Sequence, residues 1–161
     1  MSRSHRALAS LLLLAAGIAP TAASVEPARS QEQEPEMILP ACGIRYPGGF
    51  DPNTVGVAEG RVAALTRPER GPVTFRLETA GGTYTVLAAP AWYWGEIRPA
   101  VRDGERVRVK GSKTMGADGD LYLVAQEIVP AGAGETVVLR DASGKPRWSG
   151  CGPKGCAGRS R

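Results

Sequence analysis

Short segments in which hydrophobic and polar residues alternate, separated by turn-forming residues, dominate the chain from Val55 onward. The clearest is 73–78, where Val73, Phe75 and Leu77 occupy every second position and polar residues fill the others. A period of two is typical of a half-buried β-strand, because successive side chains point to opposite faces. The pattern therefore predicts an all-β domain of short strands.

Five main strands and one shorter strand follow from this pattern. Their predicted ranges are residues 56–65, 73–78, 83–88, 106–113, 121–129 and, for the short one, 136–140. The inward side chains of the third and fourth strands are predicted to be Tyr84, Val86, Ala88, Val107 and Val109. Gly60 lies in the middle of the first strand, where glycine indicates a bulge or a sharp bend.

The segment between the third and fourth strands breaks the alternation. Residues 91–98 are bounded by Pro90 and Pro99, which predicts one or two helical turns. Three strands, a short helix and two strands is the order of the OB-fold, a small Greek-key barrel. An SH3-like barrel is the alternative, but it lacks a helix at this position. We therefore predict an OB-fold-like barrel over residues 55–148.

The start of the chain has the composition of a secretory signal peptide. Residues 1–24 combine Arg3 and Arg6, an apolar run at 7–19 and small residues at 21–24. The apolar run is shorter than the roughly 20 residues that a membrane-spanning helix needs, so a cleaved leader is favoured over an anchor. We expect a periplasmic or secreted protein.

Two further segments flank the predicted barrel. Residues 25–54 have a polar, proline-punctuated start and are predicted to form an irregular lead-in or linker. Within it, the apolar run 37–44 is expected to dock on the barrel or pair at a sheet edge, and 46–53 to form a loop. Residues 149–161 form a basic tail rich in glycine and containing cysteine.

Composition restricts the chemistry. The only histidine, His5, lies in the predicted leader, so the mature chain would lack imidazole. This excludes Ser-His-Asp and Cys-His catalysis and the usual histidine-containing zinc sites. No other paired catalytic motif is present, so we expect no enzymatic activity, no cofactor and no metal. The formal net charge of +4 includes Arg3 and Arg6, which leaves about +2 for the mature chain.

A basic stripe is predicted on the outer face of the fourth strand, formed by Arg106, Arg108 and Lys110 with Lys113 next along. Such a stripe can attract an anionic ligand or nucleic acid. The alternative, favoured by the low net charge, is a solvated face that discourages edge-to-edge pairing. Nucleic-acid binding would rest mainly on the fold, which does not fix function.

The aromatic run Trp92, Tyr93 and Trp94 has two interpretations. It could form an exposed stacking surface for bases or sugars. The favoured interpretation is that these side chains close the open end of the barrel beneath the helix, since each combines an apolar body with a polar tip.

The cysteines and one acidic turn suggest weaker sites. Cys151 and Cys156 are close enough in sequence for a short-loop disulfide in an oxidising compartment, and Cys42 is then the odd thiol unless it pairs with one of them. A redox or metal role ranks below a disulfide. Asp118 and Asp120 resemble part of a calcium loop but lack the full ligand spacing, which favours a hairpin turn.

Three motifs resemble a known family. Residues 84–93 (YTVLAAPAWY) are similar to V-x-L-G-P-A-W-Y, residues 103–112 (DGERVRVKGS) to G-D-x-V-x-V-x-G-S, and residues 139–148 (LRDASGKPRW) to L-R-D-x-x-G-x-P-x-W. Together they resemble the domain shared by magnetosome proteins of the S and X types. Two features depart from it: Ala88-Ala89 replaces a glycine-containing step, and the cysteine-bearing tail is additional. The resemblance implies the fold and export, but no settled activity, because the domain is not confined to magnetosomes.

The function that these features favour is a non-enzymatic, exported OB-fold module that binds another envelope protein or an anionic ligand. One alternative is a redox or metal-handling accessory protein that uses the cysteines. A second alternative is a nucleic-acid-binding OB-fold protein.

The leader generates the first prediction. Cleavage is expected between about Ala22 and Val25, because the small residues there follow the apolar run. Mass analysis of the mature N-terminus is the measurement. Recovery of a chain that retains Met1 in the membrane fraction would contradict it.

Overall fold

The computed structural model describes residues 36–132 and 134–150. The predicted signal peptide, Cys151 and Cys156 lie outside these residues. The elements are β1 (Met37–Ile38), β2 (Arg45–Tyr46), a 3₁₀ helix (Pro52–Thr54), β3 (Val55–Thr66), β4 (Pro72–Thr79), β5 (Gly82–Pro90), α1 (Ala91–Ile97), β6 (Arg106–Met115), β7 (Leu121–Pro130) and β8 (Val137–Val138).

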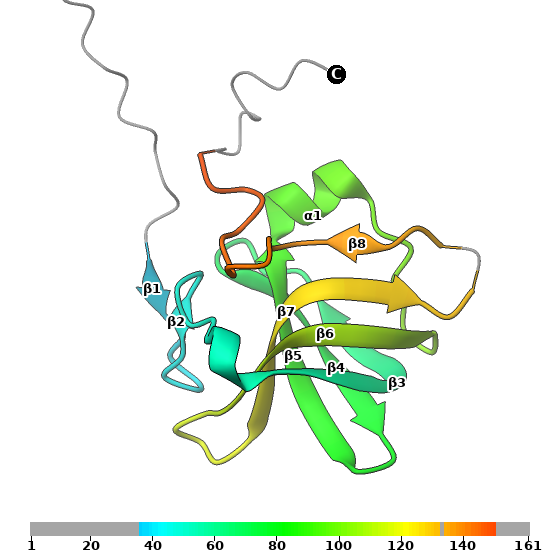
Figure 1. Cartoon of the computed structure of the whole chain (residues 1–161), viewed down its shortest axis with the longest axis horizontal. Coiled ribbons are helices and arrows are strands. Elements are labelled where there is room, and N and C mark those ends of the chain that lie inside the picture. The colour runs from blue at the N-terminus through cyan, green and yellow to red at the C-terminus, as the bar shows by residue number, and fades with distance from the viewer. Residues whose placement is uncertain (1–35, 133, 151–161) are drawn as a thin grey trace, which may run out of the picture. The chain divides into compact units, whose positions relative to one another are not determined.

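Five strands close into a barrel (Figure 1). Their order is β5-β4-β3-β6-β7, and β7 pairs in parallel with β5 to complete the ring. The other barrel pairs are antiparallel. Helix α1 connects β5 to β6, as in an OB-fold. The predicted all-β, OB-fold-like class is confirmed.

Strand β3 serves two partners. Its first half, residues 55–61, pairs with β6, and its second half, residues 61–66, pairs with β4. The change occurs next to Gly60, where an added Cβ would collide with the carbonyl oxygen of Glu78. Glycine is therefore required for the close approach of β3 and β4, and the predicted bend falls at this change of partner.

The predicted inward positions form the core. All are buried except Tyr84, which is half-buried at the edge of the cluster. The buried ones are Val73, Phe75, Leu77, Val86, Ala88, Val107 and Val109. Helix α1 adds Tyr93 and Trp94 to the same cluster. The alternation of hydrophobic and polar residues therefore predicted correctly which side chains of these strands face the core.

The lead-in covers part of the barrel wall. β1 and β2 pair with each other, and the connection between them brings Cys42 and Ile44 against Leu87, Tyr122 and Val124. Both faces of β5 are thus buried from Val86 onward, which the alternation alone did not predict. The apolar run docks on the barrel, one of its two expected arrangements.

The acidic turn closes the β6–β7 hairpin. Asp118 accepts hydrogen bonds from the Tyr122 hydroxyl at 2.6 Å and from the Asp120 N–H at 3.1 Å. The Tyr122 bond lowers the pKa of Asp118, while burial together with this bond raises the pKa of Tyr122. Both oxygens of Asp118 are therefore engaged within the turn.

The strand phase generates the second prediction. Val107→Asp places a charge in the core without a partner, so the free energy of unfolding should fall by several kcal/mol. Arg108→Ser, one position along on the exposed face, removes only an exposed ion pair and should cost at most about 1 kcal/mol. Urea-induced unfolding of both variants is the measurement, and equal losses would show that the register is wrong.

Candidate functional site

The basic stripe is present but interleaved with acidic groups. Arg106, Arg108 and Lys110 are exposed on β6, as predicted. Arg108 lies 3.9 Å from the Glu59 carboxylate on β3, and Lys110 pairs in register with Glu127 on β7. The acidic neighbours offset part of the positive field, so the stripe offers an anion less than its sequence indicates.

Lys113 does not belong to the stripe. It has the parity of the inward-facing Val107 and Val109, and its Nζ lies 5.4 Å from the centroid of the Tyr84 ring. The same Nζ donates a hydrogen bond to the Val57 carbonyl at 3.2 Å. Its inclusion in the stripe was therefore wrong, because it lies on the other face of the strand.

The less favoured interpretation, an exposed aromatic surface, is wrong for two of the three residues. Tyr93 and Trp94 are 4% and 1% exposed, and only Trp92 is half-buried. Tyr93 packs against the Trp148 ring, with 5.6 Å between centroids. Helix α1 presents these side chains to the barrel, which is the alternative that the sequence favoured.

Cysteine chemistry has little support in the described part of the chain. Cys42 is a free thiol, 3% exposed beneath the lead-in. The proposed Cys151–Cys156 disulfide lies outside the described residues and stays a prediction. Within residues 36–132 and 134–150, no group of three or more histidine, cysteine or acidic side chains could hold a metal.

A buried arginine joins the C-terminal loop to the lead-in. Arg140 is 1% exposed, and its guanidinium carbon lies 5.2 Å from the Trp148 ring centroid and 5.6 Å from that of Phe50. Its Nη1 donates to the Gly144 carbonyl at 3.0 Å, whereas Nε and Nη2 have no partner in the described structure. The cation is held mainly by two aromatic faces.

The favourable and unfavourable contributions of the buried Arg140 side chain to the free energy of folding nearly cancel. Desolvation lowers its pKa to about 10, with a smaller opposing effect from Tyr46. The guanidinium group therefore holds its proton more tightly in the unfolded chain than in the folded one. At neutral pH the charged side chain opposes folding by about 3 kcal/mol. Two cation–π contacts of about 1–2 kcal/mol each and a charged hydrogen bond offset this cost.

The adjacent turn explains the pattern of residues 139–148. One oxygen of Asp141 accepts hydrogen bonds from the backbone N–H groups of Ser143 and Lys145 at 2.9 and 3.0 Å and from the Ser143 hydroxyl at 2.6 Å. The Ser143 hydroxyl bond is the main reason that the pKa of Asp141 is lowered. Gly144 has a φ of +87° and leaves room for the Phe50 ring. This motif is therefore a clasp that fixes Arg140 and Trp148 on the barrel.

A different set of arginines surrounds a groove at the C-terminal end of α1. Arg67 comes from the β3–β4 loop, Arg98 from the residue that ends α1, and Arg102 from the α1–β6 loop. The groove has a volume of about 270 Å³, and Trp94 and Pro99 also line it. The indole N–H of Trp94 is buried and has no partner in the described structure. Three arginine residues therefore line one cavity, whose wall includes Trp94.

The charges of this groove have no carboxylate partner in the described part of the chain. The only ion pair found there is Arg108–Glu59, on β6 and β3. Two acids near Arg102 in sequence are occupied by backbone groups: Asp103 accepts from the Leu65 N–H at 2.9 Å, and Glu105 accepts from the Arg102 N–H at 3.1 Å. Glu69 and Glu96 lie two residues from Arg67 and Arg98 in sequence, but neither forms an ion pair among the described residues. Uncompensated guanidinium groups around a cavity are suited to bind carboxylate or phosphate.

Arg98 occupies a position that normally favours glycine. Its φ is +45°, in the left-handed region, and its N–H donates to the Trp94 carbonyl at 3.0 Å to end the helix. Glycine is usual at this position because a Cβ strains the conformation. A non-glycine residue with a strained backbone beside a cavity favours a role for its side chain in binding.

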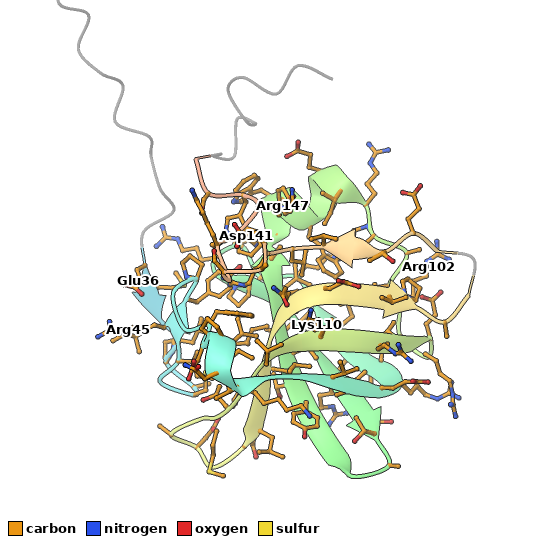
Figure 2. The ribbon with its side chains drawn as sticks, in the orientation of Figure 1. Glu36, Arg45, Arg102, Lys110, Asp141 and Arg147 are labelled. Atoms are coloured by element: carbon orange, nitrogen blue, oxygen red, sulfur yellow. The ribbon has the colours of Figure 1, made fainter. Side chains whose placement is uncertain are left out.

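Sequence reasoning missed both Arg140 and the arginine groove. Arg67, Arg98 and Arg102 lie on three separate connections and share no local spacing, so no periodic pattern could identify them. Figure 2 shows Arg102 well apart from Lys110, so the groove and the basic stripe are different surfaces.

Comparison with known protein families gives a match for the barrel strands. Residues 57–134 match the model of the MamS/MamX magnetosome protein family, which confirms the predicted resemblance over β3 to β7. The clasp at 139–148 lies beyond the matched residues. No curated protein matches the chain. The described residues contain no helix that is both long and apolar enough to cross a membrane.

The buried arginine generates the third prediction. Arg140→Met should change the free energy of unfolding by no more than about 1 kcal/mol at pH 7, because it removes a desolvated charge together with its contacts. Arg140→Ala should lose about 2–4 kcal/mol, because it also leaves a cavity. As the pH rises through about 10, the natural chain should gain stability relative to Arg140→Met, since its charge is then lost. Urea-induced unfolding at neutral and alkaline pH tests this, and equal losses in the two variants at pH 7 would contradict it.

Proposed function

We propose that the MamS/MamX-like barrel of this chain is an exported, non-enzymatic binding module, and that the groove of Arg67, Arg98 and Arg102 receives an anionic group of its partner. The observation that carries the proposal is that three arginines, none of which forms an ion pair among the described residues, line one cavity. The family match covers the barrel strands, and the groove residues 67, 98 and 102 lie within the matched segment.

The side chains of the groove suit binding better than catalysis. Apart from the arginines, they belong to Trp94, Gly95, Pro99 and Val101. None of these offers a carboxylate, hydroxyl, thiol or imidazole group that could act as a nucleophile or general base. Guanidinium groups remain charged at physiological pH and recognise planar anions through paired hydrogen bonds.

The groove is a better anion site than the basic stripe. Arg106, Arg108 and Lys110 lie on an open strand face between Glu59 and Glu127. The groove arginines are also exposed, but they line a cavity and form no ion pair within the described residues. An anion in the cavity meets guanidinium groups for which no carboxylate competes, so the two sites should differ in affinity.

The fourth prediction tests this site with citrate and pyrophosphate as anionic probes. Addition of either probe to the mature full chain should shift the Trp94 indole N–H resonance in a ¹⁵N-correlated NMR spectrum. Combined replacement by Arg67→Ser, Arg98→Gly and Arg102→Ser should weaken binding at least about tenfold, because several charged hydrogen bonds are lost. Glycine at position 98 keeps the left-handed backbone, so Arg98→Gly alone should unfold at equal or higher urea concentration.

A variant of matched charge serves as the control. Arg106→Ser with Arg108→Ser and Lys110→Ser also removes three cations, but from the stripe. It should leave the affinity for citrate within about twofold of the natural chain, apart from the general loss of positive field. If the stripe variant loses binding and the groove variant retains it, the proposed site is wrong.

A further inference from the structure

We infer that the anionic group is a carboxylate of an extended acidic peptide, and that this peptide adds as a strand to the free edge of β8. The inference rests on the proposed function, since it identifies the partner of the same arginines. It draws on a second groove, which lies on the other side of Arg98 and Pro99.

Strand β8 is the terminal strand of the sheet in the described residues, because its only partner there is β7. The Leu139 N–H donates to the Gln126 carbonyl at 2.8 Å, whereas the Leu139 carbonyl accepts from the Arg147 N–H at 2.9 Å. In this register the backbone groups of Val137, opposite Ile128, face β7. Hydrogen bonding alternates along an antiparallel pair. The N–H and C=O of Val138 therefore point away from β7, toward the open edge, and its side chain is 40% exposed.

The open edge borders a groove large enough for a short extended segment. Its volume is about 340 Å³, and one wall is formed by Glu135, Thr136, Val137 and Val138. The opposite wall is the connection that follows α1, and Figure 1 shows β8 running between β7 and this helix. An extended peptide bound in this groove would lie beside the unpaired edge of β8, which is the arrangement used in β-strand addition.

The positions of the arginines indicate which end of the bound peptide should carry its carboxylates. Arg98 and Pro99 line both grooves, so the β8 groove adjoins the one lined by Arg67 and Arg102. Glu135 is the only acidic residue lining the β8 groove, and it lies on the strand wall. A peptide whose hydrophobic residues lie along Val138 and whose carboxylates reach Arg98 satisfies both the backbone and the charges.

The occupant is inferred to be a peptide because of this strand edge. Backbone N–H and C=O groups in alternation complement another extended chain, whereas a nucleic acid offers no matching donors along its backbone. Three arginines also make too small a basic area for a long polyanion, and Glu135 interrupts it.

A capped peptide of three β-branched residues followed by two glutamates is the probe for the fifth prediction. With the mature full chain, it should shift the backbone amide resonances of Thr136 and Val138 as well as the Trp94 indole. Two altered peptides serve as comparisons: one with glutamines in place of the glutamates, and one N-methylated at alternate backbone amides. Each should bind at least tenfold more weakly, the first through lost charge and the second through lost strand pairing.

Two substitutions separate the strand edge from the anion site. Val138→Pro removes the N–H on the open side and spares the side that pairs with β7, a position where an edge strand tolerates proline. It should abolish peptide binding but keep citrate binding, which also reports that the barrel is folded. Val138→Thr retains the N–H and should bind the peptide within about threefold of the natural chain.

The outcomes distinguish the two proposals. Citrate binding without amide shifts at residues 136–138, or without any effect of N-methylation, would overturn the peptide inference and leave the anion groove standing. Failure of both citrate and the peptide to bind would refute the proposed function as well. Displacement of the peptide by a single-stranded oligonucleotide at lower concentration than by the unlabelled peptide would overturn the choice of a peptide partner.

Discussion

The bend of β3 beside Gly60 is the constraint on which the rest of the barrel depends. One strand must hydrogen-bond to β6 and then to β4, and only a residue without a side chain fits against the Glu78 carbonyl at that point. Once β3 has turned, β5 and β7 meet in parallel and the sheet closes. Closure removes exposed edges from the five barrel strands and leaves β8 outside the ring, with one side that no other described strand pairs.

Closure also determines what must cover the ends and walls. Helix α1 contributes Tyr93 and Trp94 to the core, and the lead-in covers Leu87 and Val124. The clasp then brings Arg140 between aromatic rings that come from opposite ends of the chain. A buried cation contributes little net stability, because desolvation nearly cancels its contacts. Its effect is to specify one arrangement of the flanking segments, since Gly144 and the rings fit only there.

The proposed binding surface is a consequence of how the helix is attached. Because α1 ends at Arg98 in a left-handed conformation, the chain turns sharply and brings its next residues beside β8 and the β3–β4 loop. The same short segment therefore borders both grooves. Charge recognition on one side and an open strand edge on the other are compatible with a single extended ligand, and neither requires a reacting group. In the proposed arrangement, affinity would arise from two small surfaces that share Arg98.

The sequence by itself determined the strands, their phase, the position of the helix and the glycine at the bend. These follow from local rules: side chains alternate along a strand, prolines bound a short helix, and glycine permits close approach. The same rules placed Arg106, Arg108 and Lys110 on the outer face. Lys113 has the parity of Val107 and Val109, so the same alternation places it on the other face and its assignment to the stripe was a misapplication of the rule. The alternation did not show that the lead-in buries the second face of β5. Only the tertiary structure brought Arg67, Arg98 and Arg102 together and buried Arg140 between Phe50 and Trp148. These contacts join residues far apart in the chain, and their geometry depends on how the barrel closes, which no local pattern of residues encodes.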